Sequence, residues 1–159
     1  MTQRAPYTAK FSTPFAVLGV RSAEGRLSGI DFLPLDEKPL APQDVFARQV
    51  GDQIAAYLRD PDFVFDLPLK LEGTAHQAKV WNMLAAIPRG EVRTYGEIAA
   101  RIGSSPRAVG QACGSNPIPI IIPCHRVVSK SGAGGFMHQS GGDALTIKHW
   151  LLQHERRAA

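Results

Sequence analysis

The chain has 159 residues, a formal net charge of +4, and 44% hydrophobic and 20% charged residues, as is typical of a globular protein. No apolar run reaches about 18 residues, which excludes a membrane-spanning helix, and the N-terminus lacks an apolar signal core. Two cysteines are too few for a disulfide framework. We therefore expect a cytoplasmic protein with both thiols reduced.

The charge is unevenly distributed along the chain. Residues 1–70 carry 8 Lys and Arg against 9 Asp and Glu, whereas residues 71–159 carry 10 against 5. A basic half is compatible with binding to a polyanion such as nucleic acid, although many basic proteins bind none. We predict two domains, residues 1–70 and 71–159.

The first half is predicted to be a small α+β unit. Residues 15–20 and 27–33 predict two strands joined by a turn over residues 21–26, and a loop with three prolines follows. Residues 43–59 carry apolar side chains at helical spacing. Alternating apolar residues predict a half-buried strand over residues 63–69. This half contains no Cys or His, so we expect no typical zinc site.

The second half is predicted to begin with helices. Thr74 is a candidate N-cap for a helix that ends near residues 87–90 and places Trp81 in the core. Thr94 and Glu97 have the spacing of a capping box, and Gly103 ends the helix that they begin. Together with the next helix, this predicts a mostly helical domain.

A short third helix follows a tight turn. Ser104 and Ser105 precede Pro106, which favours the first helical position. Two short helices joined in this way predict a helix-turn-helix, a motif that also occurs without DNA binding. The second helix carries the small residues Ala108, Gly110 and Ala112, so we expect its face to approach a groove closely.

A run of β-branched residues, 118–122, leads into the sequence Pro123-Cys124-His125-Arg126. A cysteine is nucleophilic as its thiolate, and an adjacent base can remove the thiol proton. The alternative is a buried structural cysteine in a core strand. A loop with five glycines over residues 129–142 and a final helix over residues 143–154 complete the chain.

Residues 116–128 resemble the active-site signature of the O6-alkylguanine-DNA alkyltransferases, and the resemblance extends from about Phe63 to Glu155. It implies a ribonuclease H-like N-terminal domain that supports a winged helix-turn-helix domain carrying the reactive cysteine. It also implies flipping of O6-alkylguanine, and less firmly O4-alkylthymine, out of duplex DNA and irreversible, stoichiometric transfer of the alkyl group to Cys124. No cofactor or metal is expected. The implied partner is double-stranded DNA, bound through the minor groove by a monomer, with cooperativity left open.

The resemblance assigns roles to individual residues. We expect Cys124 as nucleophile, His125 as base, Glu155 as the group that orients His125 and raises its pKa, Tyr95 as proton donor, and Asn116 as a brace. Arg107 matches a finger that fills the gap left by a flipped base, and Arg126 is expected to pair internally. The expected DNA-binding residues are Ser104, Ser105, Arg107, Ala108, Gly110 and Gln111, together with Tyr95. The expected pocket residues are Cys113, Val127, Gly135, Phe136 and Met137.

Three other functions stay open on the sequence. A lesion sensor related to this family lacks the cysteine, and Cys124 argues against it. A transcription regulator would need base-reading side chains, which the second helix of the motif largely lacks. A thiol hydrolase is a further alternative, without a recognisable hydrolase motif. The glycine-rich loop also leaves open which residue between 136 and 141 contacts the substrate oxygen.

Overall fold

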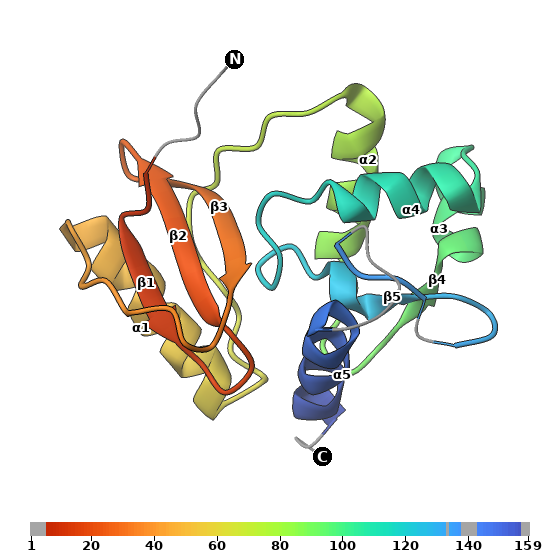
Figure 1. Cartoon of the computed structure of the whole chain (residues 1–159). Coiled ribbons are helices and arrows are strands. Elements are labelled where there is room, and N and C mark those ends of the chain that lie inside the picture. Colours follow the sequence, from red (N-terminus) through yellow and green to blue (C-terminus); the bar gives the residue numbers. More distant parts are fainter. Residues whose placement is uncertain (1–5, 133, 138–142, 157–159) are drawn as a thin grey trace. The chain divides into compact units, whose positions relative to one another are not determined.

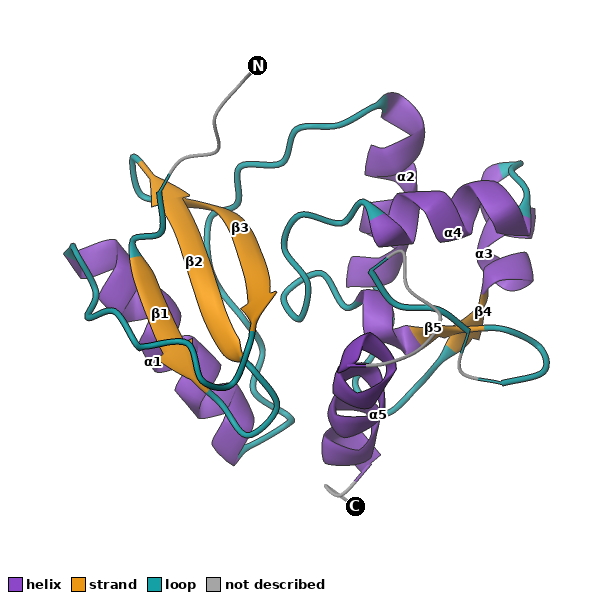
Figure 2. Cartoon of the chain, viewed as in Figure 1, coloured by secondary structure: helices purple, strands orange, loops and turns teal. Residues whose placement is uncertain are grey.

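The computed structural model describes residues 6–132, 134–137 and 143–156 (Figures 1 and 2). The chain folds into two compact units, Met1–Leu71 and Glu72–Ala159. Both combine helices with small sheets, so the predicted mixed α and β class is confirmed. None of the described helices is long and apolar enough to cross a membrane.

The first unit is an antiparallel sheet with one helix. The strands β1 (Ala9–Ser12), β2 (Val17–Ala23) and β3 (Arg26–Leu33) pair in the order β1-β2-β3. The helix α1 (Val45–Arg59) lies along one face of the sheet (Figure 1). The predicted hairpin is confirmed, but its turn is shorter than expected. Glu24 and Gly25 both have positive φ, the conformation of tight hairpin turns, so pairing continues to that point.

Two predictions for the first unit were incomplete or wrong. The short edge strand β1 was not predicted. The predicted strand over residues 63–69 is not formed, although the side chains do alternate in exposure. Only Leu69 makes a bridge, to Leu27. The side chain of Gln53 bonds both backbone groups of Asp66, and these bonds replace the ladder that a neighbouring strand would provide.

The second unit is mostly helical. Its helices are α2 (Ala75–Ala85), α3 (Tyr95–Ile102), α4 (Pro106–Gly114) and α5 (Asp143–Arg156). A short 3-10 helix, η1 (Cys124–Arg126), leads into β5 (Val127–Val128), which pairs in parallel with β4 (Arg93–Thr94). The cysteine therefore begins a helical turn and does not lie in a core strand.

Side-chain caps determine where these helices begin. Thr74 and Gln77 form a reciprocal capping box at α2. Thr94 accepts a hydrogen bond from the backbone of Glu97, and Ser105 caps α4 in the same way. Gly103 ends α3 with a left-handed φ of 67°, which glycine adopts without steric cost. The three predicted helix starts and the stop at Gly103 are thus confirmed.

The core of the second unit connects α2 to α4. Trp81 is 3% exposed, as predicted, and its indole nitrogen donates to the Ala112 carbonyl oxygen at 2.9 Å. The prediction that Ala112 lies on an open face was therefore wrong, because this residue packs inward. Only part of α4 remains available to a partner.

Candidate active site

The segment that joins α4 to η1 is held by the side chain of Asn116. Its Nδ2 donates to the Ile122 carbonyl oxygen at 2.8 Å, and its Oδ1 accepts from the Ile118 backbone at 3.0 Å. Within this segment Ile120 has a φ of 76°, which a β-branched residue rarely adopts. Asn116 is 2% exposed, so its two bonds fix this conformation away from water. Cys124 follows directly after the braced turn.

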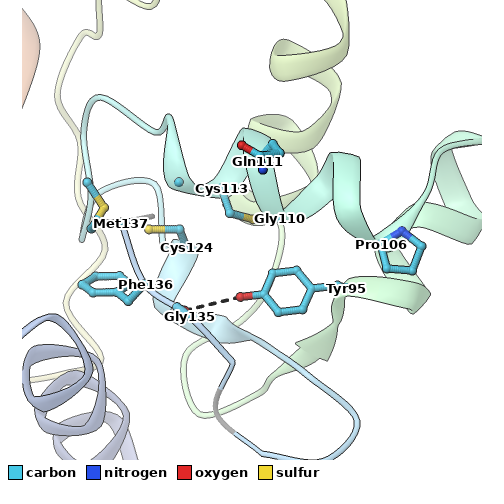
Figure 3. Close-up of a pocket in the computed structure, with 10 residues that line it drawn as sticks. Tyr95, Pro106, Gly110, Gln111, Cys113, Cys124, Gly135, Phe136 and Met137 are labelled. Carbon is cyan, nitrogen blue, oxygen red and sulfur yellow. Dashed lines mark hydrogen bonds between the residues drawn. The ribbon is translucent and has the colours of Figure 1, made fainter. Parts of the chain in front are cut away.

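Cys124 is 3% exposed and lines a cavity of about 370 Å³ (Figure 3). The walls of this cavity come from α3, α4 and the segment after β5; they comprise Tyr95, Pro106, Gly110, Gln111, Cys113, Gly114, Gly135, Phe136 and Met137. Four of the five predicted pocket residues lie there. The fifth, Val127, is fully buried and is not among the described residues that line the cavity.

The Cys124 thiol lies in surroundings that disfavour its charged form, the thiolate. Burial raises the pKa of Cys124 to about 11, although the Asn116 hydrogen bond and the charge of Lys148 act in the opposite direction. The pKa of Cys113 is raised to about 12, first by burial and then by Cys124. Both groups are therefore thiols at neutral pH, and Cys124 requires a base to become nucleophilic.

The structure brings together two residues that lie 30 positions apart in the sequence, His125 and Glu155. His125 Nε2 and Glu155 Oε2 are 2.7 Å apart, and the two side chains are 0% and 1% exposed. Arg126 donates from Nε to Glu155 Oε1 at 2.9 Å and from Nη2 to Oε2 at 3.0 Å. The carboxylate is thus shared between a two-pronged guanidinium and an imidazole.

These contacts define the resting protonation of the pair. Burial alone would raise the pKa of Glu155, but hydrogen bonds from His125 and Arg126 hold that pKa well below its usual value. Burial lowers the pKa of His125; Glu155 opposes this effect, while the charges of Arg126 and Lys148 add to it. Glu155 thus raises the pKa of His125 as expected, but burial and the charges of Arg126 and Lys148 outweigh this effect, and the net shift of that pKa is downward.

A neutral His125 has one nitrogen available as a base. If Nε2 carries the proton that bonds Glu155, then Nδ1 presents a lone pair. Nδ1 is buried and has no hydrogen-bond partner among the described residues. Since His125 follows Cys124 in the same helical turn, this arrangement can accept a thiol proton directly or through water.

Lys148 was missed by the sequence analysis. It is 0% exposed, and its Nζ donates to the Val127 carbonyl oxygen at 2.7 Å and to the Gly135 carbonyl oxygen at 2.8 Å. Burial lowers the pKa of Lys148 to about 8, and the two thiols oppose this shift. Its spacing from Ala144 and Leu151 places it on the apolar stripe of α5, which is the signal that could have identified it.

Tyr95 approaches the cavity from α3. Its hydroxyl donates to the Gly135 carbonyl oxygen at 3.4 Å (Figure 3). Lys148 donates to the same oxygen. The pKa of Tyr95 is raised to about 12, first by burial and then by the nearby thiols Cys113 and Cys124. Tyr95 thus keeps its proton and can donate it within the cavity.

The predicted DNA-binding residues cluster around the start of α4. Ser105 and Arg107 are exposed, Ser104 is half-buried and bonds His76 at 2.8 Å, and Ala108 is half-buried. Gly110 and Gln111 line the cavity. The helix that presents these small and polar residues therefore also forms one wall of the Cys124 pocket.

The segment after β5 is described only in part. Phe136 is 4% exposed and forms a wall beside Cys124 (Figure 3). Residues 138–142, which include most of the predicted substrate-oxygen contacts, lie outside the described residues. No group of three or more His, Cys, Asp or Glu side chains in the described part of the chain could hold a metal ion.

Comparison with known proteins points to one family. The profile "6-O-methylguanine DNA methyltransferase, DNA binding domain" matches residues 75–157. A methylated-DNA–protein-cysteine methyltransferase of Methanosarcina acetivorans is 40% identical over 158 residues, covering 94% of this chain and 97% of that protein. A probable methylated-DNA–protein-cysteine methyltransferase of Acanthamoeba polyphaga mimivirus is 48% identical over 98 residues, which cover 60% of this chain and 62% of that one.

A solved structure agrees over both units. The crystal structure of Mycobacterium tuberculosis OGT in complex with DNA superimposes with a TM-score of 0.79 and 35% identity, covering 94% of this chain and 92% of that one. The similarity therefore includes the first unit, where the sequence signature was weak.

Proposed function

The chain belongs to the 6-O-methylguanine DNA methyltransferase family, and we propose that it repairs DNA by transferring the alkyl group of O6-alkylguanine to Cys124. The observation that carries this proposal is a buried thiol on a cavity wall, followed by a histidine whose free nitrogen is turned away from its carboxylate partner. Without that thiol the site could only bind a lesion.

The proposed reaction forms one bond and breaks one. The Cys124 sulfur attacks the alkyl carbon, the carbon–oxygen bond breaks, and guanine leaves as its anion. His125 accepts the thiol proton, and Tyr95 donates toward the developing charge on the base. His125 then loses its added proton and Tyr95 regains one, by exchange through water, so that overall one alkyl group moves from oxygen to sulfur and one proton moves from sulfur to guanine. The thioether is not reversed, so each molecule acts once.

The burial of Cys124 and His125 explains how a thiol with a high pKa can react. Because the thiol proton passes to His125, directly or through one water, the barrier depends on the difference between the proton affinities of Cys124 and His125. Glu155 stabilises the imidazolium that forms, and Lys148 lies near enough to favour the thiolate. The resting site remains neutral at sulfur until a substrate fills the cavity.

We propose that DNA reaches this cavity along α4. Arg107 would enter the base stack from the minor groove, while Ala108 and Gly110 permit close approach and Ser104, Ser105 and Gln111 contact the strand. A cavity of about 370 Å³ lies at the lower end of the roughly 300–1,000 Å³ typical of small-molecule sites, which suits a single extruded base.

Several finer features belong to the same proposal. They are the ribonuclease H-like character of the first unit and its supporting role, the winged helix-turn-helix of the second, action as a monomer in the cytoplasm, and weaker activity on O4-alkylthymine. The main support for the DNA partner is the relative solved in complex with DNA. Cooperativity on DNA stays open.

Mass spectrometry tests the reaction directly. The protein is mixed with a duplex oligonucleotide containing O6-methylguanine and then digested. We expect the peptide containing Cys124 to gain one methyl group and the base to become guanine. An unmodified protein that still binds the duplex would indicate a lesion sensor, and methylation of Cys113 alone would refute the assigned nucleophile.

A further inference from the structure

The guanidinium of Arg126 makes three directed contacts around the active site. It donates to both oxygens of Glu155 and, from Nη1, to the Ile87 carbonyl oxygen at 2.6 Å. Its position is therefore fixed by the backbone at the end of α2 as well as by α5. Glu155 Oε2 accepts from Arg126 and faces His125 Nε2 at the same time.

We infer that Arg126 is a positioning residue that keeps His125 in its neutral, proton-accepting form by acting through Glu155. The inference rests on the proposed function, in which His125 takes the thiol proton. Arg126 touches neither the cavity nor Cys124 among the described contacts, so its effect is indirect.

A buried carboxylate whose sole partner is a histidine favours the imidazolium, because each charge compensates the other. A histidine that is already protonated cannot accept a proton from a thiol. Arg126 occupies both oxygens of Glu155 and adds a positive charge beside His125. The negative charge of Glu155 is therefore already compensated, and protonation of His125 is no longer favoured.

Other groups around His125 also affect the balance between its neutral and protonated forms. Lys148, on α5, adds a second cation, and Cys124 precedes His125 in η1. Arg89 donates to the backbone oxygen of Glu155 at 2.9 Å and fixes the end of α5. Arg126 is bonded to both carboxylate oxygens of Glu155, and it is therefore the group expected to control the protonation of His125 through Glu155.

A purely structural role makes a different prediction. If Arg126 only ties residue 87 to residue 155, then removing either partner loosens the same packing. The His125 pKa would then move in the same direction in Arg126→Gln and Glu155→Gln. If Arg126 sets the protonation of the pair, the two substitutions move that pKa in opposite directions, up for Arg126→Gln and down for Glu155→Gln.

The experiment is an NMR titration of the full chain with isotope-labelled histidine, before any exposure to DNA. His125→Gln identifies the His125 signal by its loss. We expect a higher His125 pKa than in the wild type for Arg126→Gln and a lower one for Glu155→Gln. Arg126→Lys keeps the positive charge but loses the paired N–H donors of the guanidinium. The pKa of His125 in this variant should stay within about half a unit of the wild-type value.

Methyl transfer against pH gives the second readout. In Arg126→Gln the acid limb of the rate profile should move to higher pH by the same amount as the His125 pKa. At a fixed pH on that limb, the rate should fall about tenfold for each unit by which the pKa rises. Shifts of equal sign in the two glutamine variants would overturn the inference. If Arg126→Gln does not fold, Arg126→Lys provides the test. A His125 pKa that differs from the wild-type value by more than about half a unit in that variant would then overturn the inference. A wild type that transfers no methyl group refutes the proposed reaction and leaves the titration interpretable.

Discussion

The two units differ in what they bury. In the described part of the first unit, the buried polar residues are Thr13 and Ser22, which are 9% and 8% exposed. Among its described residues, the second unit buries four polar or ionisable side chains at 2% exposure or less: Asn116, His125, Lys148 and Glu155. Burying a charge is costly unless it is fully bonded. The difference indicates that the second unit accepts this cost for chemistry, whereas the first follows ordinary packing.

The largest effect is expected at the nucleophile. Cys124→Ser should abolish methyl transfer, because a hydroxyl nearly matches the thiol in shape but lacks its nucleophilicity, and DNA binding should persist. Cys113→Ser is the matched control, since it changes the other thiol of the same cavity. It should retain transfer in a single-turnover assay. Loss of activity in the control alone would exchange the roles of the two cysteines.

Glu155→Gln should destabilise the second unit strongly. It leaves the Arg126 charge without its buried partner, and breaking a buried ion pair costs about 3–5 kcal/mol. Glu97→Gln, at an exposed carboxylate, is the control and should change the free energy of unfolding by under about 0.5 kcal/mol. Denaturant unfolding measures both. Equal effects would mean that Glu155 behaves as a surface charge.

Acid should reproduce part of this effect in the wild type. The Glu155 pKa is lowered on folding, so its stabilisation is fully present above the unfolded value near 4.5 and is lost as the pH falls from there toward the folded pKa. The free energy of unfolding should therefore decline below about pH 4.5 in the wild type and decline less in Glu155→Gln.

Lys148→Met tests the buried ion that the sequence analysis missed. Its loss leaves the Val127 and Gly135 carbonyls without this donor, at a cost of about 1–3 kcal/mol for a buried group left unpaired. The wild-type lysine has a pKa lowered from 10.5 to about 8, so its contribution to stability increases as the pH rises from 8 toward 10.5. The stability gap between the wild type and Lys148→Met should widen over that range.

Arg107→Ala tests how DNA engages the second unit. Arg107 is exposed, so stability should hardly change. Repair of a duplex should slow more than reaction with the free modified base, because the arginine acts on flipping and not on bond formation. Binding to DNA should weaken with added salt in both proteins, since phosphate contacts release counterions. Equal slowing on both substrates would contradict the finger role.

Two glycines give the finest test. Gly134 and Gly103 have φ values of 75° and 67°, so alanine at either position carries a backbone cost of about 1 kcal/mol. A Cβ at Gly134 would also lie 2.9 Å from Tyr95 Cε2, whereas a Cβ at Gly103 has nothing within 4 Å. Gly134→Ala should therefore displace Tyr95 and slow methyl transfer, while Gly103→Ala should lower stability alone. Identical rates would show that Tyr95 adjusts freely.

Local sequence signals predicted the helical caps of the second unit well. Thr74, Thr94, Gly103 and Ser105 act through neighbours within four residues, so their patterns are readable without tertiary structure. The strand expected over residues 63–69 failed for the opposite reason. At Asp66 both backbone groups are bonded by the side chain of Gln53, and a pattern of alternating residues cannot indicate which distant group occupies a backbone bond.

By itself, the sequence determined which chemistry the second unit could hold, because the Pro123-Cys124-His125-Arg126 run and Glu155 are visible in it. Tertiary structure decided the protonation of that site. Cys124, His125 and Lys148 have their pKa values shifted chiefly by burial, which depends on how α5 packs against η1 and on the shared carboxylate of Glu155. Desolvation is a property of the folded surroundings, and no spacing of residues along the chain specifies it.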